Sequence, residues 1–214
     1  MLAELRSPSE VERLMQALPV VATAEAGLAD KVVVITGATQ GVGLVVARRF
    51  GVLGAKLVIN GRRADAVRDA VEMLQKEGLQ VKGVVADAAT AIGAQALIAD
   101  AVEAFGTFDI LVNNAAIAGP YAAAWDARVT DVDETVRVNL TGPILCALEA
   151  VRWLTAHGKQ GRVVNVSSIT TEGEYPKFTH YSTTKAGLEA FTRYIAADLA
   201  DAQVVVTALI LPSV

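Results

Sequence analysis

Two side chains in the second half of the sequence have the types and spacing of a proton-transfer site. Tyr181 and Lys185 are four residues apart at the start of a predicted helix, so they share one helix face. An ammonium near a phenol favours the tyrosinate and lowers a phenol pKa that is ordinarily about 10. Tyr181 is therefore predicted to give or take a proton near neutral pH. Lys185 can also donate to the ribose hydroxyls of a bound cofactor, and Tyr181 is predicted to contact the cofactor as well.

Ser168 completes this predicted catalytic group. It ends a predicted strand, where its hydroxyl can hold the oxygen of a substrate. A Tyr-x-x-x-Lys pair by itself also occurs by chance on exposed helices. Because a glycine-rich turn and a serine at a strand end accompany the pair, we favour the catalytic interpretation.

Asn139 is predicted to support the same chemistry from another helix. It lies within a predicted helical stretch over residues 130–157, and Pro143 follows it by four residues. Proline has no N–H to donate to the Asn139 carbonyl, and its ring crowds that oxygen. The spacing predicts a kink and a free carbonyl that can anchor a proton-relay water. A simple packing kink is the alternative.

A glycine-rich turn follows the first predicted strand. The segment from Thr36 to Gly43 carries glycines at 37, 41 and 43, and a helix begins at once. Glycines allow the backbone to approach a pyrophosphate, and the helix N-terminus offers free N–H groups and a positive dipole end. The G-x-x-x-G-x-G spacing differs from the usual G-x-G-x-x-G dinucleotide pattern, and a tight turn is the alternative. The candidate cofactor contacts here are Gly37, Thr39, Gln40, Gly41, Val42 and Gly43.

The end of the second predicted strand indicates which dinucleotide binds. An acidic residue about twenty residues beyond the glycines ordinarily accepts the ribose 2′-hydroxyl of NAD. Here the sequence has Arg62 and Arg63 instead, and guanidinium groups suit a 2′-phosphate. This pattern favours NADP, with Arg62 as the candidate contact. Asp65 keeps NAD as the less favoured cofactor, and two solvated arginines are the alternative.

Polar residues after the third and fourth predicted strands are expected at the same sheet edge. The carboxylate of Asp87 can accept a hydrogen bond from an adenine amino group. Asn113 can tie neighbouring strands together, and Ala115 follows it in the same segment. Asp87 and Asn113 are equally compatible with Asx-turns, a common role of these residue types after a strand. We predict that Asp87, Asn113 and Ala115 belong to the cofactor site.

The elements that must position these residues alternate regularly along the chain. Apolar runs such as residues 32–35 are typical of parallel strands buried on both faces. The alternation predicts an α/β fold with a doubly wound parallel sheet, a three-layer Rossmann fold. The domain covers residues 29–214, and residues 1–28 form an N-terminal extension with a helix over residues 7–18. Strands are predicted at residues 31–36, 56–60, 80–85, 109–113, 162–166 and 204–210, and helices at 41–53, 64–77, 91–105, 130–157 and 179–201.

Composition excludes several classes of protein. The 214 residues are 53% hydrophobic and 20% charged, which excludes disorder for most of the chain. The formal net charge of −4 argues against a nucleic-acid partner, and the uncharged run over residues 110–125, which no other run exceeds, is too short for a membrane span. No cluster of residues has metal-ligand spacing. Cys146 is the only cysteine, so no internal disulfide forms, and we expect a cytoplasmic protein.

Taken together, residues 29 to 212 resemble the short-chain dehydrogenase/reductase family, and the stretch from Ser167 to Lys185 is similar to bacterial glucose dehydrogenases and ketoreductases. The resemblance rests on the glycine turn, Asn113-Asn114-Ala115-Ala116, Asn139, Ser168 and the Tyr181–Lys185 pair. It implies the strand order 3-2-1-4-5-6 and reversible oxidoreduction of a small carbonyl or secondary alcohol substrate. It also implies that Tyr181 is the acid/base, Lys185 binds ribose, Ser168 positions the substrate oxygen and Asn139 supports the relay. Pro212 is placed in the cofactor site, and a homodimer or homotetramer is expected.

The sequence departs from the family pattern in ways that leave a second function open. Ala116 replaces a glycine, Ser213 follows Pro212 where the family has glycine, and the sequence ends at Val214. Family members continue with a helical lid and a seventh strand, so we expect a fold shortened after the sixth strand, trimmed or natural. The absent lid favours a non-catalytic dinucleotide-binding sensor or scaffold, whereas the complete set of catalytic candidates favours an enzyme.

Overall fold

The computed structural model describes residues 27–119 and 121–212. The helix predicted over residues 7–18, and nearly all of the extension over residues 1–28, lie outside the described residues and stay predictions.

The described strands form one sheet in which every neighbouring pair is parallel. Its order is β3-β2-β1-β4-β5-β6, as the family resemblance implies. The chain direction across the sheet reverses between β1 and β4, so the turns that follow these two strands meet at the switch point where α/β proteins bind ligands. The strands are β1 (Val32–Ile35), β2 (Lys56–Gly61), β3 (Val81–Val85), β4 (Ile110–Asn113), β5 (Gly161–Ser168) and β6 (Val204–Leu211).

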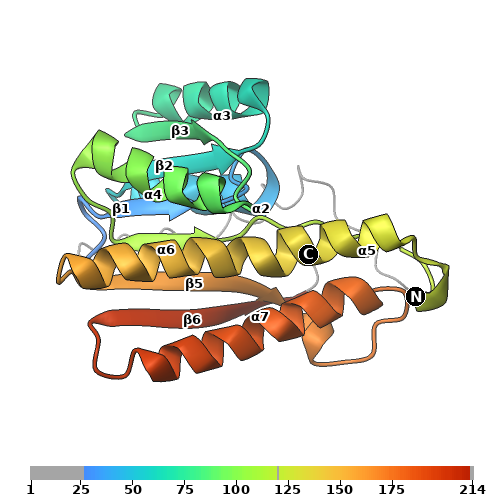
Figure 1. The fold of residues 1–214 in the computed structure, drawn as a ribbon. Helices are drawn as coiled ribbons and strands as arrows, with labels where there is room; N and C mark the ends of the chain where they lie inside the picture. Colours follow the sequence, from blue (N-terminus) through green and yellow to red (C-terminus); the bar gives the residue numbers. More distant parts are fainter. Residues whose placement is uncertain (1–26, 120, 213–214) are drawn as a thin grey trace.

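Helices cover the sheet on both faces, which confirms the three-layer prediction (Figure 1). On one face Leu44 and Leu74, from α2 and α3, pack against β1 and β2. On the other face Leu97, Ala147 and Ile195 close a second core from α4, α6 and α7. No helix among the described residues is both long and apolar enough to cross a membrane. The bounds are α2 (Gly41–Val52), α3 (Ala64–Lys76), α4 (Ala91–Phe105), α5 (Val129–Val136), α6 (Gly142–Ala156) and α7 (Thr179–Asp198).

The long helix predicted over residues 130–157 is three segments in a row. A π-helical turn over Arg137–Thr141 joins α5 to α6, and the Gly142 N–H donates to the Arg137 carbonyl five residues earlier. Pro143 at the start of α6 has no N–H to offer the carbonyl four residues before it. The chain accommodates this proline with a wider turn, and Figure 1 shows α5 and α6 following one another in line.

The turn after β1 packs tightly against the segment after β4. A Cβ at Gly37, where φ is 62°, would lie 2.8 Å from the Ala115 Cα. A Cβ at Gly43 would collide with the Gly37 carbonyl oxygen and lie 2.5 Å from the Asn114 Nδ2. These two glycines are therefore required by backbone packing at the switch point.

The substitution Gly43→Ala is expected to lower the free energy of unfolding. Its methyl group meets backbone that cannot move without displacing the whole turn, and overpacking of this kind costs about 1–3 kcal/mol. The loss outweighs the roughly 1 kcal/mol that alanine gains over glycine in a helix. Chemical denaturation followed by circular dichroism measures the change.

The matched control is Gly187→Ala in α7, where the new Cβ meets only the Leu140 side chain, at 3.3 Å. This variant is expected to be as stable as the wild type or slightly more so. Equal effects of the two substitutions would contradict the packing role of Gly43.

Candidate active site

A crevice of about 530 Å³ opens at the carboxyl ends of β1 to β4. This volume lies in the range of small-molecule and cofactor sites. Every candidate cofactor contact predicted from Gly37 to Ala115 lines it. The lining includes Gly37, Thr39, Gln40, Gly41, Val42, Gly43, Arg62, Arg63, Asp87, Asn113 and Ala115.

The mouth of the glycine turn fits a phosphate group. Gly41 opens α2 with φ at 56°, and a Cβ built there would meet nothing within 4 Å. Gln40 at the N-cap makes no capping hydrogen bond with its side chain, so the first N–H groups of α2 are not occupied by it. Of the three glycines, Gly41 is thus the one whose missing side chain leaves room in the crevice, beside the positive end of the helix.

Asn114 and Thr36 hold this turn in place, and neither was predicted as a cofactor contact from the sequence. The Asn114 side-chain amide donates to the carbonyls of Thr36 and Gly37, at 3.0 and 3.1 Å. The Thr36 hydroxyl in turn accepts from the N–H groups of Asn114 and Ala115, at 3.0 and 3.1 Å. No local sequence pattern indicates these hydrogen bonds, because the partners are about eighty residues apart in the sequence.

Asn113 ties secondary-structure elements together, which was one of its two sequence interpretations. Its side-chain amide donates to the Pro143 carbonyl at 3.0 Å and to the Asn165 side chain on β5 at 2.9 Å. Asn165 donates onward to Thr192 of α7 at 2.9 Å. The Asn113 Oδ1 is buried and has no partner among the described residues, although Asn113 lines the crevice. A ligand that offers a donor there would satisfy it.

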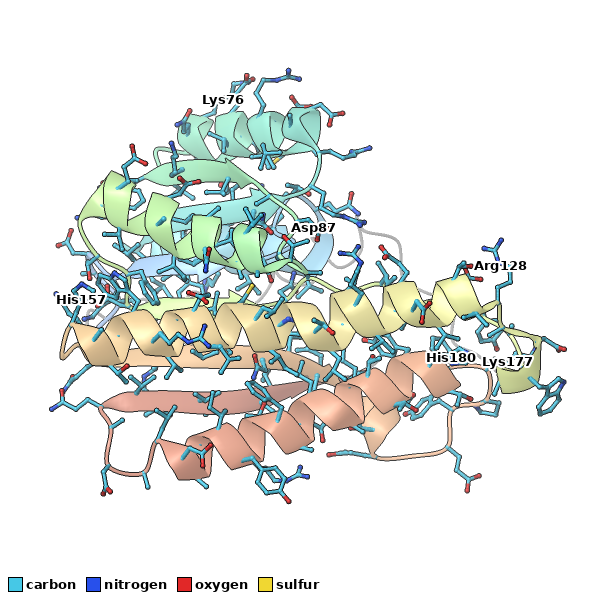
Figure 2. All side chains as sticks on the ribbon, viewed as in Figure 1. Lys76, Asp87, Arg128, His157, Lys177 and His180 are labelled. Atoms are coloured by element: carbon cyan, nitrogen blue, oxygen red, sulfur yellow. The ribbon has the colours of Figure 1, made fainter. Side chains whose placement is uncertain are left out.

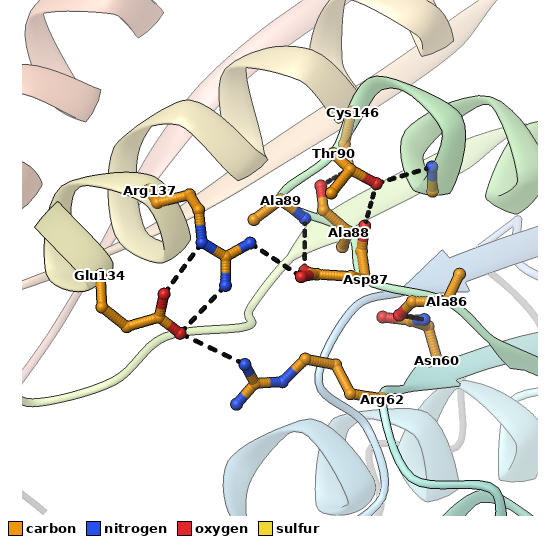
Figure 3. A network of polar contacts seen from close by, with 11 residues as sticks. Asn60, Arg62, Ala86, Asp87, Ala88, Ala89, Thr90, Glu134, Arg137 and Cys146 are labelled. Carbon is orange, nitrogen blue, oxygen red and sulfur yellow. Dashed lines mark hydrogen bonds and ion pairs between the residues drawn. The ribbon is translucent and has the colours of Figure 1, made fainter.

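Asp87 makes the Asx-turn that its position allowed and an ion pair that the sequence did not reveal (Figure 3). Its Oδ1 accepts from the Ala89 N–H at 3.0 Å, and its Oδ2 lies 2.7 Å from Arg137 Nη1. Partial burial acts to raise the pKa of Asp87, but the Ala89 N–H and the Arg137 guanidinium together hold it below its usual range. The carboxylate therefore stays ionised at neutral pH.

Arg62 extends from the end of β2 and contacts Glu134 of α5. The Arg62 Nη1 lies 3.4 Å from Glu134 Oε1, and the two side chains are 56% and 40% exposed. Beneath it, Asn60 donates to the carbonyls of Val84 and Ala86, which fixes the ends of β2 and β3 together. The backbone next to Arg62 is thus fixed by the bonds of Asn60, whereas the Arg62 guanidinium has a single long contact, with Glu134.

The predicted catalytic group comes together on α7 and the end of β5. Lys185 is 2% exposed, donates to the Val166 carbonyl at 2.7 Å and lies 5.6 Å from the centre of the Tyr181 ring. The Ser168 hydroxyl is close enough to the Tyr181 phenol for their hydrogen bond to affect its titration. Ser168 also accepts from the Thr170 N–H and hydroxyl, at 3.3 and 3.2 Å.

The predicted lowering of the Tyr181 pKa is wrong. Burial raises the pKa of Tyr181 above its ordinary value, and the hydrogen bond with Ser168 lowers it by less. Burial also lowers the pKa of Lys185 to about 8. The ammonium lies over the ring and donates to a backbone carbonyl, so desolvation dominates the titration of the phenol.

Asn139 acts through its side chain in a way that the sequence did not indicate. It is fully buried, its Oδ1 accepts from the Ile117 N–H at 2.8 Å, and its Nδ2 donates to the Ile117 carbonyl at 2.7 Å. The paired bonds clamp the segment after β4 against the π-helical turn. The free Asn139 carbonyl and its relay water stay a prediction.

A family model described as short chain dehydrogenase matches residues 31–214. The chain belongs to this family.

Similar proteins agree with the assignment. "Dehydrogenase/reductase SDR family member 4" from Homo sapiens is 36% identical over 182 residues, which is 85% of this chain and 65% of that protein. The chain thus spans about two thirds of this relative. A short-chain dehydrogenase/reductase from Burkholderia phymatum, solved in complex with NAD, has a TM-score of 0.83 and 28% identity, covering 86% of this chain and 66% of that one. A metagenomic short-chain oxidoreductase solved with NADP has a TM-score of 0.80 and 26% identity, covering 87% and 85%.

Not every predicted contact of this short-chain dehydrogenase lies in the crevice. Tyr181 and Lys185 are not part of the lining as described, and neither is Pro212, which is exposed beyond the end of β6. Figure 2 shows Asp87 where the chain leaves β3, and His180, the residue before Tyr181, at the far end of the molecule where α7 begins. Cofactor and catalytic candidates therefore occupy different parts of the molecule, and the Asn113–Asn165 hydrogen bond connects the crevice to β5.

Glu189 is a further residue that the sequence analysis missed. It lies one turn beyond Lys185 on α7 and accepts hydrogen bonds from the Ser167 hydroxyl and, at 2.8 Å, from the Thr171 hydroxyl. These two hydroxyls flank Ser168, so Glu189 fixes the backbone on both sides of it. The i, i+4 spacing of residues 181, 185 and 189 was the available signal.

The substitution Lys185→Met is expected to stabilise the protein at neutral pH. The folded state holds Lys185 with a pKa of about 8 instead of 10.5, so below pH 8 the buried ammonium destabilises it. After allowance for the lost bond to Val166, the gain is on the order of 2 kcal/mol. The advantage shrinks as pH rises from about 8 to 10.5, because the wild-type amine then loses its proton. Urea denaturation across this pH range measures it.

Lys76→Met on the exposed surface of α3 is the control, and it should change the free energy of unfolding little at any pH. A Lys185→Met protein less stable than the wild type at pH 7 would contradict the desolvation argument.

Proposed function

We propose that this protein is an oxidoreductase that transfers a hydride between NADP(H) and a small carbonyl or secondary alcohol substrate. The observation that carries the proposal is the Tyr181 phenol beside the Ser168 hydroxyl, with the Lys185 ammonium over its ring. The crevice lined by the glycine turn supplies a dinucleotide-sized site on the same sheet edge. The expected homodimer or homotetramer stays a prediction, as does the cytoplasmic location.

The nicotinamide dinucleotide is supported as the cofactor class by both the comparisons and the site. The two structural relatives named above were solved with NAD and with NADP, so relatedness alone does not choose between them. The choice of NADP rests on Arg62 and Arg63, which line the crevice beyond β2 without an acidic residue at the ribose-reading position. NAD is the less favoured cofactor.

The chain's own residues supply placement and a proton. When bound, the dinucleotide carries the hydride. Ser168 holds the substrate oxygen by hydrogen bonding, and Tyr181 donates its phenolic proton to that oxygen as the carbonyl carbon is reduced. Lys185 stabilises the tyrosinate that forms and offers its N–H groups to ribose. Asn139 keeps the segment around Ile117 in position between crevice and helix.

The protonation state of Tyr181 determines which direction of the reaction, reduction or oxidation, is favoured at a given pH. Because burial raises its pKa, the phenol is protonated at neutral pH and ready to donate. Carbonyl reduction therefore needs no change of protonation near pH 7. Alcohol oxidation needs the tyrosinate as base, so its rate is expected to rise with pH in the alkaline range.

Replacing Tyr181 with phenylalanine tests the catalytic proposal. Tyr181→Phe removes the only proton that the proposed mechanism transfers, so kcat with a panel of carbonyl substrates is expected to fall by about 10² or more. The Kd for NADPH, measured by fluorescence titration, is expected to change by less than about threefold, because the phenol is not part of the crevice lining.

Tyr194→Phe, an exposed tyrosine on the same helix, is the control and should keep full turnover. Unchanged turnover in Tyr181→Phe would remove the phenol from the mechanism. Wild-type protein that binds NADPH but turns over no carbonyl substrate would favour the sensor or scaffold alternative.

The cofactor proposal has its own test in Arg62→Ala. Loss of a guanidinium that contacts the 2′-phosphate is expected to weaken NADPH binding about tenfold or more, the size of a hydrogen bond to a charged group. NADH binding should change by much less, because NADH lacks the phosphate. Arg68→Ala removes the same charge from the exposed face of α3 and should leave the NADPH/NADH ratio unchanged. An equal loss for both nucleotides would contradict the 2′-phosphate role.

A further inference from the structure

Four charged side chains contact one another in a line, and two of them, Arg62 and Asp87, line the crevice (Figure 3). Arg62 contacts Glu134 of α5, although 72 residues separate them in the sequence. Glu134 in turn contacts Arg137, and Arg137 contacts Asp87 after β3. Two guanidinium and two carboxylate groups therefore alternate in one line that joins β2, α5 and β3.

The contacts in this line weaken toward Arg62. Arg137 Nη1 lies 2.7 Å from Asp87, and Arg137 binds both carboxylate oxygens of Glu134 at 2.9 Å. The Arg62 contact is a single one, at 3.4 Å. Arg62 is also the most exposed of the four side chains, at 56%. Arg137 thus fixes Glu134 in place, and Arg62 is the member free to change partners.

Glu134 and a 2′-phosphate would use the same guanidinium. A guanidinium binds carboxylate and phosphate with the same fork of N–H donors, so one group must be displaced before the other binds fully. NADH has a 2′-hydroxyl and does not compete for Arg62, so its binding leaves the Arg62–Glu134 contact intact.

We propose that Glu134 is a specificity-determining residue that competes with the 2′-phosphate for Arg62 and so lowers the preference for NADP over NAD. The inference rests on the proposed dinucleotide binding. The protein supplies its own anion, the Glu134 carboxylate, to the guanidinium that the 2′-phosphate would use. On the Arg62 guanidinium, binding of NADP then replaces the Glu134 carboxylate with the 2′-phosphate, whereas binding of NAD replaces nothing.

The test is Glu134→Gln, which removes the charge and leaves one oxygen for Arg137. The dissociation constants of NADPH, NADH and adenosine 2′,5′-bisphosphate are measured by calorimetry for the wild type and the variant. NADPH and the bisphosphate are expected to bind about fivefold more tightly, the upper end for an exposed ion pair. NADH is expected to change by less than about twofold, since no partner of its ribose is released.

Two controls separate this role from general charge and from structure. Asp133→Asn removes a carboxylate from the neighbouring, exposed position of α5, which makes no ion pair among the described residues, and should leave the NADPH/NADH ratio unchanged. In an Arg62→Ala background, Glu134→Gln should no longer improve NADPH binding, because the guanidinium they compete for is gone. Glu134→Met, of similar length and without charge, should shift the ratio in the same direction as Glu134→Gln.

Three results would overturn the inference. These are an equal change for NADPH and NADH, weaker NADPH binding in Glu134→Gln and Glu134→Met, or a gain that persists without Arg62. Wild-type protein that binds neither nucleotide would instead overturn the proposed function itself, and the two failures are thereby told apart.

Discussion

The close approach of two backbone segments at the switch point of the sheet sets the geometry of everything around it. The turn after β1 and the segment after β4 touch where Gly37 faces Ala115, and Asn114 and Thr36 lock them with four hydrogen bonds. A parallel sheet covered on both faces brings these ends together, and the missing side chains let them meet. Residues of both joined segments line the crevice.

A second constraint is the burial of Tyr181 and Lys185 on α7. Holding an ammonium at 2% exposure beneath a half-buried phenol works against folding, and a single carbonyl on β5 offsets only part of this cost. Asn165, buried beside that carbonyl, links β5 to Asn113 and to Thr192. This network fixes β5 and α7 relative to each other beside the buried ammonium, although the Asn113 Oδ1 has no partner among the described residues.

Periodic and local features could be predicted from the sequence. The strand order, both layers of helices, the crevice lining from Gly37 to Ala115 and the pairing of Tyr181 with Lys185 follow from apolar runs, turn chemistry, helix spacing and family resemblance. What could not be predicted depends on contacts between distant residues or on burial. The Arg62–Glu134 contact and the clamp of Asn139 on Ile117 join separate elements, and the raised pKa of Tyr181 reflects desolvation that no spacing reports. Pro212, placed by resemblance alone, lies outside the crevice lining.

The π-helical turn between α5 and α6 lets one continuous helical segment make contacts in two directions. An additional residue in a helix rotates everything beyond it by about 100° relative to the regular winding. Arg137, at the start of this turn, is directed to Asp87, while Asn139, two positions later, grips the loop around Ile117. The π-helical turn therefore sets the face on which each side chain lies. Removing a single residue from Arg137–Thr141 would restore regular α-helical winding, and Arg137 and Asn139 could then not both reach their partners.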